Sequence, residues 1–145
     1  MSAQTDPRVK PHVRAAAQLI ANTFGITDIG GFATTGHISD SDHYKGLAID
    51  VMTTTKGREV SSWAVQNAKQ LCITYVIWNR QIWDSRDGKG WVPYHGTSPH
   101  TDHVHISFFP TCDSSGTGGV VNASFSSDLS DRMGCLNALK SLLGL

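Results

Sequence analysis

The sequence predicts an α+β fold, with two or three helices packed on a small, mostly antiparallel sheet. Apolar residues recur at helical spacing over residues 8–24 and 58–71. Runs rich in β-branched, aromatic and alternating apolar residues occupy 47–52, 72–78 and 103–109. The chain of 145 residues is long enough for one domain with its own core, and it leaves little room for a second.

The first predicted helix covers residues 8–24. It has Pro11 at an early position, where proline is well tolerated, and Gly25 directly after its end. A short strand is predicted over 32–34. The polar, glycine-containing residues 35–46 then predict a loop.

The predicted strand over 47–52 alternates, with apolar residues on one face and Ala48, Asp50 and Met52 on the other. A second helix is expected over 58–71. The remaining elements, in chain order, are a strand over 72–78, a short returning strand over 81–83, a long loop over 84–101 and a strand over 103–109.

The composition changes after Pro110. Residues 112–128 are rich in Ser and Gly, which is typical of a flexible linker. Residues 129–145 carry apolar residues in a roughly helical pattern. We therefore divide the chain into a folded domain over 1–111, a linker over 112–128 and a short C-terminal helical segment over 129–145.

Charge and cysteine content exclude several classes of protein. Twelve Lys and Arg balance twelve Asp and Glu, so we do not expect a nucleic-acid-binding protein. No run of 18 apolar residues is present, so we expect no membrane span. Three cysteines without a CxxC spacing predict neither a disulfide framework nor a thiolate zinc site. The first eight residues lack the apolar core of a signal peptide, so we expect no export by that route.

Polar side chains interrupt two of the predicted strands. Asp50 lies in the strand over 47–52, and His103 and His105 share one face of the strand over 103–109. Buried polar groups are costly unless they are paired or bound to a metal. If the two strands pair, Asp50 and His105 face one point, and His43 can fold over it from the preceding loop.

Two imidazoles and one carboxylate leave a fourth coordination position open, which is the ligand set of a catalytic zinc site. Each residue taken alone also fits an ordinary structural role without a metal. A single His on a strand is more often a hydrogen-bonded core residue than a ligand, and a single Asp more often forms a salt bridge or a turn. The joint spacing of His43, Asp50 and His105 is what favours a metal.

Residues 41–50 read Ser-Asp-His-Tyr-Lys-Gly-Leu-Ala-Ile-Asp, which resembles the SxHxxGxAxD motif of D-alanyl-D-alanine carboxypeptidase and L-alanoyl-D-glutamate endopeptidase-type zinc peptidases. That wider group includes lysostaphin-like peptidases and the hedgehog signalling domain. Residues 102–105, Asp-His-Val-His, look like its second motif. The resemblance covers roughly residues 30–109. It implies one zinc ion per chain, held by His43, Asp50 and His105.

The resemblance also implies a role for Asp102 as the general base. Zinc would activate a water molecule and polarise the scissile carbonyl, and Asp102 would move the proton to the leaving amine. Many members carry Glu where Asp102 stands, and many have an upstream Arg that steadies the substrate carbonyl. No Arg occurs in residues 31–37, so we expect His37, Lys45 or His103 to take that part.

Attack of water on the scissile carbonyl would form a tetrahedral intermediate with a negatively charged oxygen. His103 is our first choice for stabilising this oxyanion, because strand alternation places it on the same face as His105. The alternative is that His103 orients a metal ligand. A peptide groove is expected near the second motif, with walls from Trp83, Trp91, Tyr94, His95 and His100. The alternative for Trp91 is packing of the loop onto the sheet.

The resemblance implies a monomeric zinc peptidase that hydrolyses the stem peptides of bacterial peptidoglycan. A phage endolysin or a lysin carried on a phage particle would be the natural setting, since neither needs a signal peptide. A hedgehog-like, zinc-stabilised binding module without catalysis is the first alternative. A structural domain with a buried His/Asp network is the second.

Overall fold

The computed structural model describes residues 1–113, which form an α+β domain as the sequence predicts. Six strands form one sheet in the order β1-β2-β6-β3-β4-β5, and all neighbours in it are antiparallel. The strands are β1 (Ile29–Gly30), β2 (Ala48–Met52), β3 (Ile73–Trp78), β4 (Gln81–Asp84), β5 (Trp91–Pro93) and β6 (His103–Phe108).

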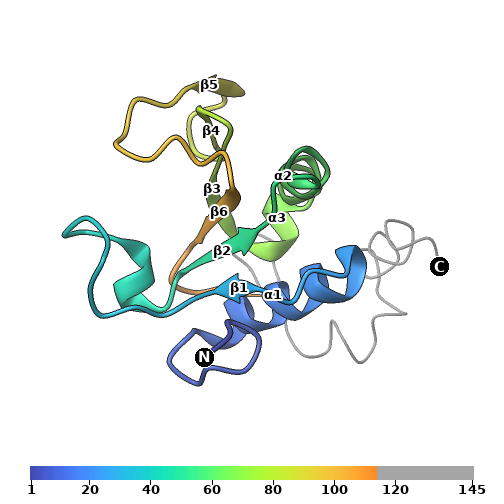
Figure 1. Ribbon diagram of the computed structural model, residues 1–145, viewed down its shortest axis with the longest axis vertical. Coiled ribbons are helices and arrows are strands. Elements are labelled where there is room, and N and C mark those ends of the chain that lie inside the picture. The colour runs from blue at the N-terminus through green and yellow to red at the C-terminus, as the bar shows by residue number, and fades with distance from the viewer. Residues whose placement is uncertain (114–145) are drawn as a thin grey trace.

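Three α-helices cover one face of this sheet, and a short 3-10 helix lies among the loops (Figure 1). Helix α1 begins with a proline in its first turn and ends where Gly25 adopts a left-handed φ of 70°. The helices are α1 (Pro11–Phe24), α2 (Gly57–Gln66), α3 (Ala68–Leu71) and the 3-10 helix η1 (Asp42–Lys45).

The single helix predicted over 58–71 is interrupted at Asn67. The φ of Asn67 is −106°, outside the helical range, and its side-chain amide donates to the carbonyl of Trp63 at 2.8 Å. The same carbonyl also accepts from the backbone N–H of Asn67 at 3.0 Å, so Asn67 holds the end of α2 with two bonds while the chain changes direction into α3. Asparagine favours such local bonds over a continuous helix, so the break is a consequence of this residue.

The two faces of the sheet differ because side chains alternate along each strand. Ile49 and Val51 of β2 and Ile106 of β6 are fully buried on the helical side, where the core lies. Asp50 and His105 point to the other side, where the loops after β1 and before β6 lie in Figure 1. Polar residues therefore collect on the side of the sheet that no α-helix covers.

The N-terminal ten residues pack beneath those loops. The backbone N–H of Ala3 donates to Ile29 at 2.9 Å, and that of Lys10 donates to Gly46 at 3.0 Å. Gly46 has a φ of +71°, and a Cβ built there would overlap the carbonyl oxygen of Arg8. The glycine of the first motif is therefore needed both for its backbone conformation and for this close approach.

Three predictions about the chain path are wrong. The strand predicted over 32–34 is absent, and β1 forms instead at Ile29–Gly30, where Ile29 pairs with Val51. The loop predicted over 84–101 contains the additional edge strand β5. The loop predicted over 35–46 contains η1. Strands of two or three residues and single helical turns carry too little periodicity to be recognised in a sequence.

A disulfide joins Cys72 to Cys112, although the cysteine spacing predicts no disulfide framework, and the two Cα atoms are 5.7 Å apart. Cys72 directly follows α3 in a left-handed conformation, and its carbonyl accepts from the N–H of Phe109 at 2.8 Å. The antiparallel pairing of β3 with β6 brings these distant segments together. The bridge therefore results from topology, which cysteine spacing does not reveal.

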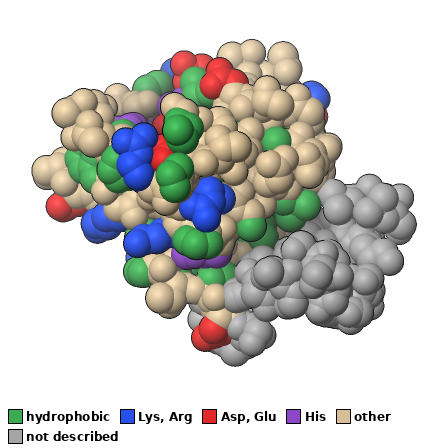
Figure 2. Space-filling model, turned by 90° about the horizontal axis from the view of Figure 1, so that it is seen from below, with side chains coloured by type: hydrophobic (Ala, Val, Ile, Leu, Met, Phe, Trp, Pro, Cys, Tyr) green, Lys and Arg blue, Asp and Glu red, His purple; other side chains and the backbone are tan. Residues whose placement is uncertain are grey.

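Apart from Cys112 and Asp113, the predicted linker and C-terminal helical segment lie outside the described residues. Among residues 1–113, no helix has the length and apolar character that a membrane crossing requires. On the face drawn in Figure 2, acidic and basic side chains are scattered among uncharged surface. This distribution agrees with the balanced charge of the sequence.

Candidate metal centre

Strand register places Asp50 and His105 directly opposite each other. Asp50 of β2 pairs with His105 of β6, and both side chains project from the face that the helices leave uncovered. The Oδ1 atom of Asp50 lies 3.0 Å from Nδ1 of His105. The pairing that the sequence suggests for these two residues is therefore formed.

His43 reaches the same point from η1. The Ser41 side chain accepts from the backbone N–H of His43 at 3.2 Å and so caps the helical turn. The imidazole is buried, and its Nδ1 lies 2.7 Å from the carbonyl oxygen of Gly31. A carbonyl can only accept, so Nδ1 carries the proton and Nε2 is turned toward Asp50.

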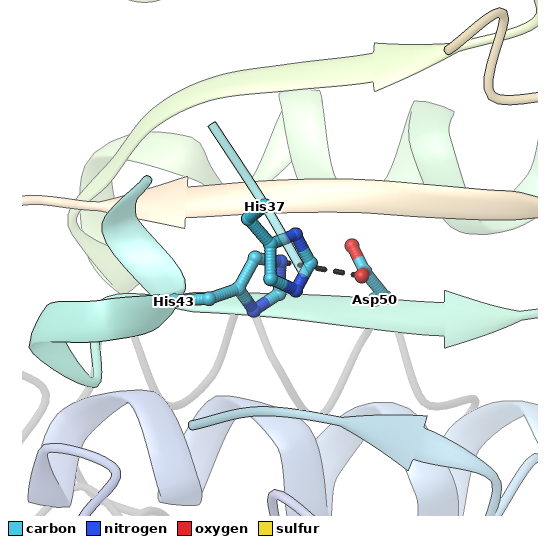
Figure 3. Close-up of side chains that lie close together, drawn as sticks. All are labelled: His37, His43 and Asp50. Atoms are coloured by element: carbon cyan, nitrogen blue, oxygen red, sulfur yellow. Dashed lines mark ion pairs between the residues drawn. The ribbon is translucent and has the colours of Figure 1, made fainter. Parts of the chain in front are cut away.

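The Nε2 atom of His43 lies 3.2 Å from Oδ2 of Asp50 (Figure 3), and it has no hydrogen-bond partner. With a proton fixed on Nδ1, a neutral His43 would point a lone pair at a carboxylate. Such an arrangement is repulsive unless a proton or a metal cation lies at this point. The buried, unpartnered nitrogen thus fits a cation-binding site.

The electrostatics of the pair agree with this geometry. Burial disfavours the charged form of both side chains. The opposing effect is larger, because the neighbouring imidazoles of His105 and His43 hold the pKa of Asp50 well below its usual range. The carboxylate in turn raises the pKa of His43 above its ordinary value despite burial. Asp50 is therefore an ionised carboxylate that attracts positive charge.

His37 stacks on His43, with ring centroids 4.2 Å apart and an angle of 19° between the planes (Figure 3). Its backbone is held by Tyr44, whose hydroxyl accepts from the His37 N–H at 2.9 Å and donates to the His37 carbonyl at 2.8 Å. Ligand atoms of His37, His43 and Asp50 lie within 4.8 Å of one another. These three residues could hold a metal ion.

His105 is the third residue that contacts Asp50 closely. Its Nε2 atom lies 2.8 Å from the hydroxyl oxygen of Ser107, and its ring stacks on Tyr75 with centroids 5.5 Å apart. Ser107 can accept from Nε2, which leaves the Nδ1 lone pair directed at the carboxylate of Asp50. In that tautomer His105 has the form that a metal ligand requires.

Asp102 and His103 form a second acid–imidazole pair at the start of β6. Oδ1 of Asp102 accepts from Nδ1 of His103 at 2.7 Å, and this hydrogen bond lowers the pKa of Asp102. The Asp102 side chain is 68% exposed. His103 Nε2 lies 3.8 Å from Oδ1 of Asp50, so His103 is the member of the pair that reaches the centre.

A cavity of about 350 Å³ opens beside these residues. Its lining comes from the loops that precede η1 and β6, from η1 itself, and from strands β3 and β6. His37, His43 and His105 line it, together with Tyr94 and His100 of the groove wall that the sequence predicts. The additional lining residues are Gly36, Ile38, Asp40, Ser41, Tyr75, Ile77, Thr97 and Ser98.

His100 is the most distinctive residue of this wall. It is buried, its φ is 55°, and its ring lies between Tyr94 and His103, with centroid distances of 5.3 and 4.6 Å. Burial lowers the pKa of His100 to about 4, and its Nδ1 donates to the carbonyl of Ser98 at 2.7 Å. The dense group of histidines from 95 to 105 was the available signal for this residue.

Two of the substrate-binding candidates, Lys45 and Trp91, are not brought to this centre. Lys45 is 59% exposed, and its Nζ lies 3.9 Å from Oδ1 of Asp42. Trp91 pairs with Trp83 on the helical side of the sheet and lines a different cavity. The centre is therefore built by His37, His43, Asp50, His103 and His105, with Tyr94 in the cavity wall.

One comparison with known proteins identifies a family. The sequence model of the family described as "VldE, C-terminal domain" matches residues 5–105. No curated protein and no solved structure matches the chain. The matched span includes His43, Asp50 and His105, so the whole centre lies within it.

Proposed function

We propose that this chain, which belongs to the VldE C-terminal domain family, is a zinc-dependent peptidase acting on the stem peptides of bacterial peptidoglycan. The family description names a domain and no reaction. The metal chemistry of the proposal rests on the side-chain geometry described above. The peptide substrate rests on the resemblance of residues 41–50 and 102–105 to the two motifs of the zinc peptidases.

One observation carries the metal part of the proposal. His43 has a buried Nε2 atom without a hydrogen-bond partner, and that atom is aimed at the ionised carboxylate of Asp50. A structural His/Asp network would be expected to satisfy each buried nitrogen. A metal ion would satisfy His43 and Asp50 together, while the Gly31 carbonyl orients the imidazole from behind.

His43, Asp50 and His105 are the residues we assign as ligands. Two imidazoles and a carboxylate form a common donor set for catalytic zinc, which leaves one position for solvent or substrate. Bound there, zinc would supply Lewis acidity that activates water and polarises the scissile carbonyl. His37, stacked flat against His43, is assigned to the substrate side of the centre.

The chain's own residues would handle the proton. Asp102 accepts from Nδ1 of His103 and so fixes the tautomer in which His103 Nε2 carries a lone pair. That nitrogen lies at the centre and can accept a proton there and return it to the leaving amine. We therefore assign acid–base work to the Asp102–His103 pair, with Tyr94 positioned in the wall to bind the peptide.

The proposed setting follows from the substrate. The protein would reach the bacterial wall from a phage, as an endolysin or on the phage particle. It would act there as a monomer on stem peptides, without a membrane or nucleic-acid partner. The Cys72–Cys112 disulfide is consistent with activity outside the reducing cytosol.

The test is digestion of purified peptidoglycan with the zinc-loaded full chain, followed by mass spectrometry of the new termini. We expect release of stem-peptide fragments. Each of His43→Ala, Asp50→Ala and His105→Ala should lose bound zinc and activity together and should lower the melting temperature of the zinc-loaded protein, because metal binding is linked to folding.

Lys45→Ala is the matched control, because this residue lies within the first motif but its exposed side chain pairs with Asp42 at the surface. It should keep full zinc content and cleavage. A ligand variant that kept zinc would contradict the assigned ligand set. Zinc-loaded protein that released no peptide from peptidoglycan would contradict the substrate.

A zinc-stabilised binding module is the second candidate, and His37 is the observation that favours it. A ligand atom of His37 lies within 4.8 Å of ligand atoms of His43 and Asp50. If His37 supplied a fourth donor, it would close the position that catalysis needs. The role of His37 therefore decides between the two functions.

A further inference from the structure

A second cavity, of about 280 Å³, lies on the helical side of the sheet, away from the metal centre. Strand pairing sets this placement. Trp78 pairs with Gln81, Trp91 pairs with Trp83, and these side chains share the face of buried Val76. The lining residues are Arg58, Ser61, Ser62, Trp78, Asn79, Gln81 and Trp91.

Two indoles form the apolar part of this cavity. Trp78 and Trp91 are only partly buried, although both pack against the edge of the core. Trp78 is held in place by the first turn of α2, where a Cβ built at Gly57 would overlap its ring. A wall fixed in this way needs little ordering when a ligand binds.

The other lining side chains are hydrogen-bonding groups. Asn79 and Gln81 supply exposed amides, and Ser62 supplies an exposed hydroxyl. Arg58 adds a guanidinium that has no ion-pair partner among residues 1–113. Indole faces beside amides, a hydroxyl and a guanidinium suit a ligand with a flat apolar face and a polar rim.

The backbone of the β3–β4 turn is strained beside this cavity. Asn79 and Arg80 have φ values of 49° and 66°, and glycine is the usual residue at the second of these positions in a two-residue hairpin. Strained backbone persists where the surrounding structure enforces it, often at functional sites. Here the strain places Asn79 at the rim.

We infer that this cavity is a saccharide-binding site. A pyranose ring presents C–H groups on its faces and hydroxyls around its edge. Its faces would stack on Trp78 and Trp91, and its edge would bond to Gln81, Asn79 and Arg58. A neutral N-acetylhexosamine and a uronic acid share this chemistry, and Arg58 would favour the acid through its charge.

The test is two-dimensional NMR of the full chain with ¹⁵N-labelled tryptophan, titrated with chitotetraose and separately with tetragalacturonate. The chain has four tryptophans, and Trp63 in the core serves as the internal reference. We expect saturable shifts of the Trp78 and Trp91 indole signals and none at Trp63. Removing zinc should leave these shifts unchanged, so this result is independent of the proposed peptidase activity.

Variants at exposed positions avoid damage to the core. Gln81→Ala should weaken binding about fivefold, which is the loss of one hydrogen bond. Gln66→Ala, at the far end of α2, should bind as the parent does. If Arg58→Gln removes a preference for tetragalacturonate, the acidic sugar is the ligand class. If chitotetraose binds more tightly and Arg58→Gln leaves the affinity unchanged, the N-acetylhexosamine is the ligand class. Absence of saturable indole shifts with both sugars would overturn the site.

Discussion

The proton on His43 Nδ1 has a single acceptor, the carbonyl of Gly31, and this one bond determines which nitrogen faces Asp50. The same logic operates at His103, whose Nδ1 is committed to Asp102. In both residues a backbone or carboxylate oxygen fixes the tautomer and leaves Nε2 for the centre. The protonation of the nitrogens that face Asp50 therefore depends on the Gly31 carbonyl and the Asp102 carboxylate, which bind the opposite nitrogens of the two rings.

His37→Ala tests whether the fourth position is open. We expect this variant to keep one zinc per chain and to lose much of its hydrolysis, because His37 lines the cavity and we propose that it contacts the substrate. Zinc content by elemental analysis and cleavage by mass spectrometry are the measurements. Loss of zinc, with cleavage already absent in the parent protein, would instead identify His37 as a ligand of a closed, structural site.

His103→Ala and Asp102→Asn separate the two members of the acid–base pair. Both should retain zinc. If His103 carries the proton, His103→Ala should lower kcat about 10² to 10⁴-fold, and Asp102→Asn should lower it less, because only orientation is lost. Steady-state kinetics on a released stem-peptide fragment provide the measurement. The reverse order would return the base to Asp102, as the motif resemblance implies.

At the scale of elements, the position of η1, which carries His43, depends on Gly46, the residue that directly follows this helical turn. This glycine combines a φ of +71° with close contact to the Arg8 carbonyl, so the N-terminal segment and the first motif interlock there. The hydrogen bond from the N–H of Lys10 to Gly46 at 3.0 Å reinforces the contact. The position of His43 consequently depends on residues more than thirty places earlier in the chain.

Gly46→Ala should therefore lower the free energy of unfolding by more than the conformational penalty of a positive φ alone. Gly25→Ala is the matched control, because Gly25 has a φ of +70° and nothing within 4 Å of its added Cβ. We expect the control to lower the free energy of unfolding by about 1 kcal/mol. Gly46→Ala should lower it by about 2 kcal/mol more. Urea denaturation measures both, and equal losses would contradict the interlock.

At the scale of the whole molecule, the disulfide closes a sequence separation of 40 residues. Reduction should lower the free energy of unfolding by about 2 to 4 kcal/mol, chiefly because the unfolded chain gains freedom. Urea denaturation with and without reductant is the measurement. In the double variant Cys72→Ala, Cys112→Ala the reductant should have no effect, and a remaining response would mean that the stabilisation has another source.

The sequence predicted the parts of the fold that have long local patterns. Alternation located β2 and β6 and placed Asp50 and His105 on one face, and register then confirmed that they meet. The approach of His37 to His43 was not visible, because it depends on the path of a loop held by Tyr44. The sequence does not predict contacts that depend on the course of a loop, because only contacts within regular elements leave a periodic pattern of apolar residues.

The location of the disulfide has a mechanical consequence. Cys112 follows β6, the strand that carries His105, and the bridge ties it covalently to Cys72 beside α3. A pulling force applied beyond residue 113 would reach this bond before it reached the hydrogen bonds of β6. Tension from that direction would thus be diverted into the start of β3, and His105 would keep its position while the chain is under load.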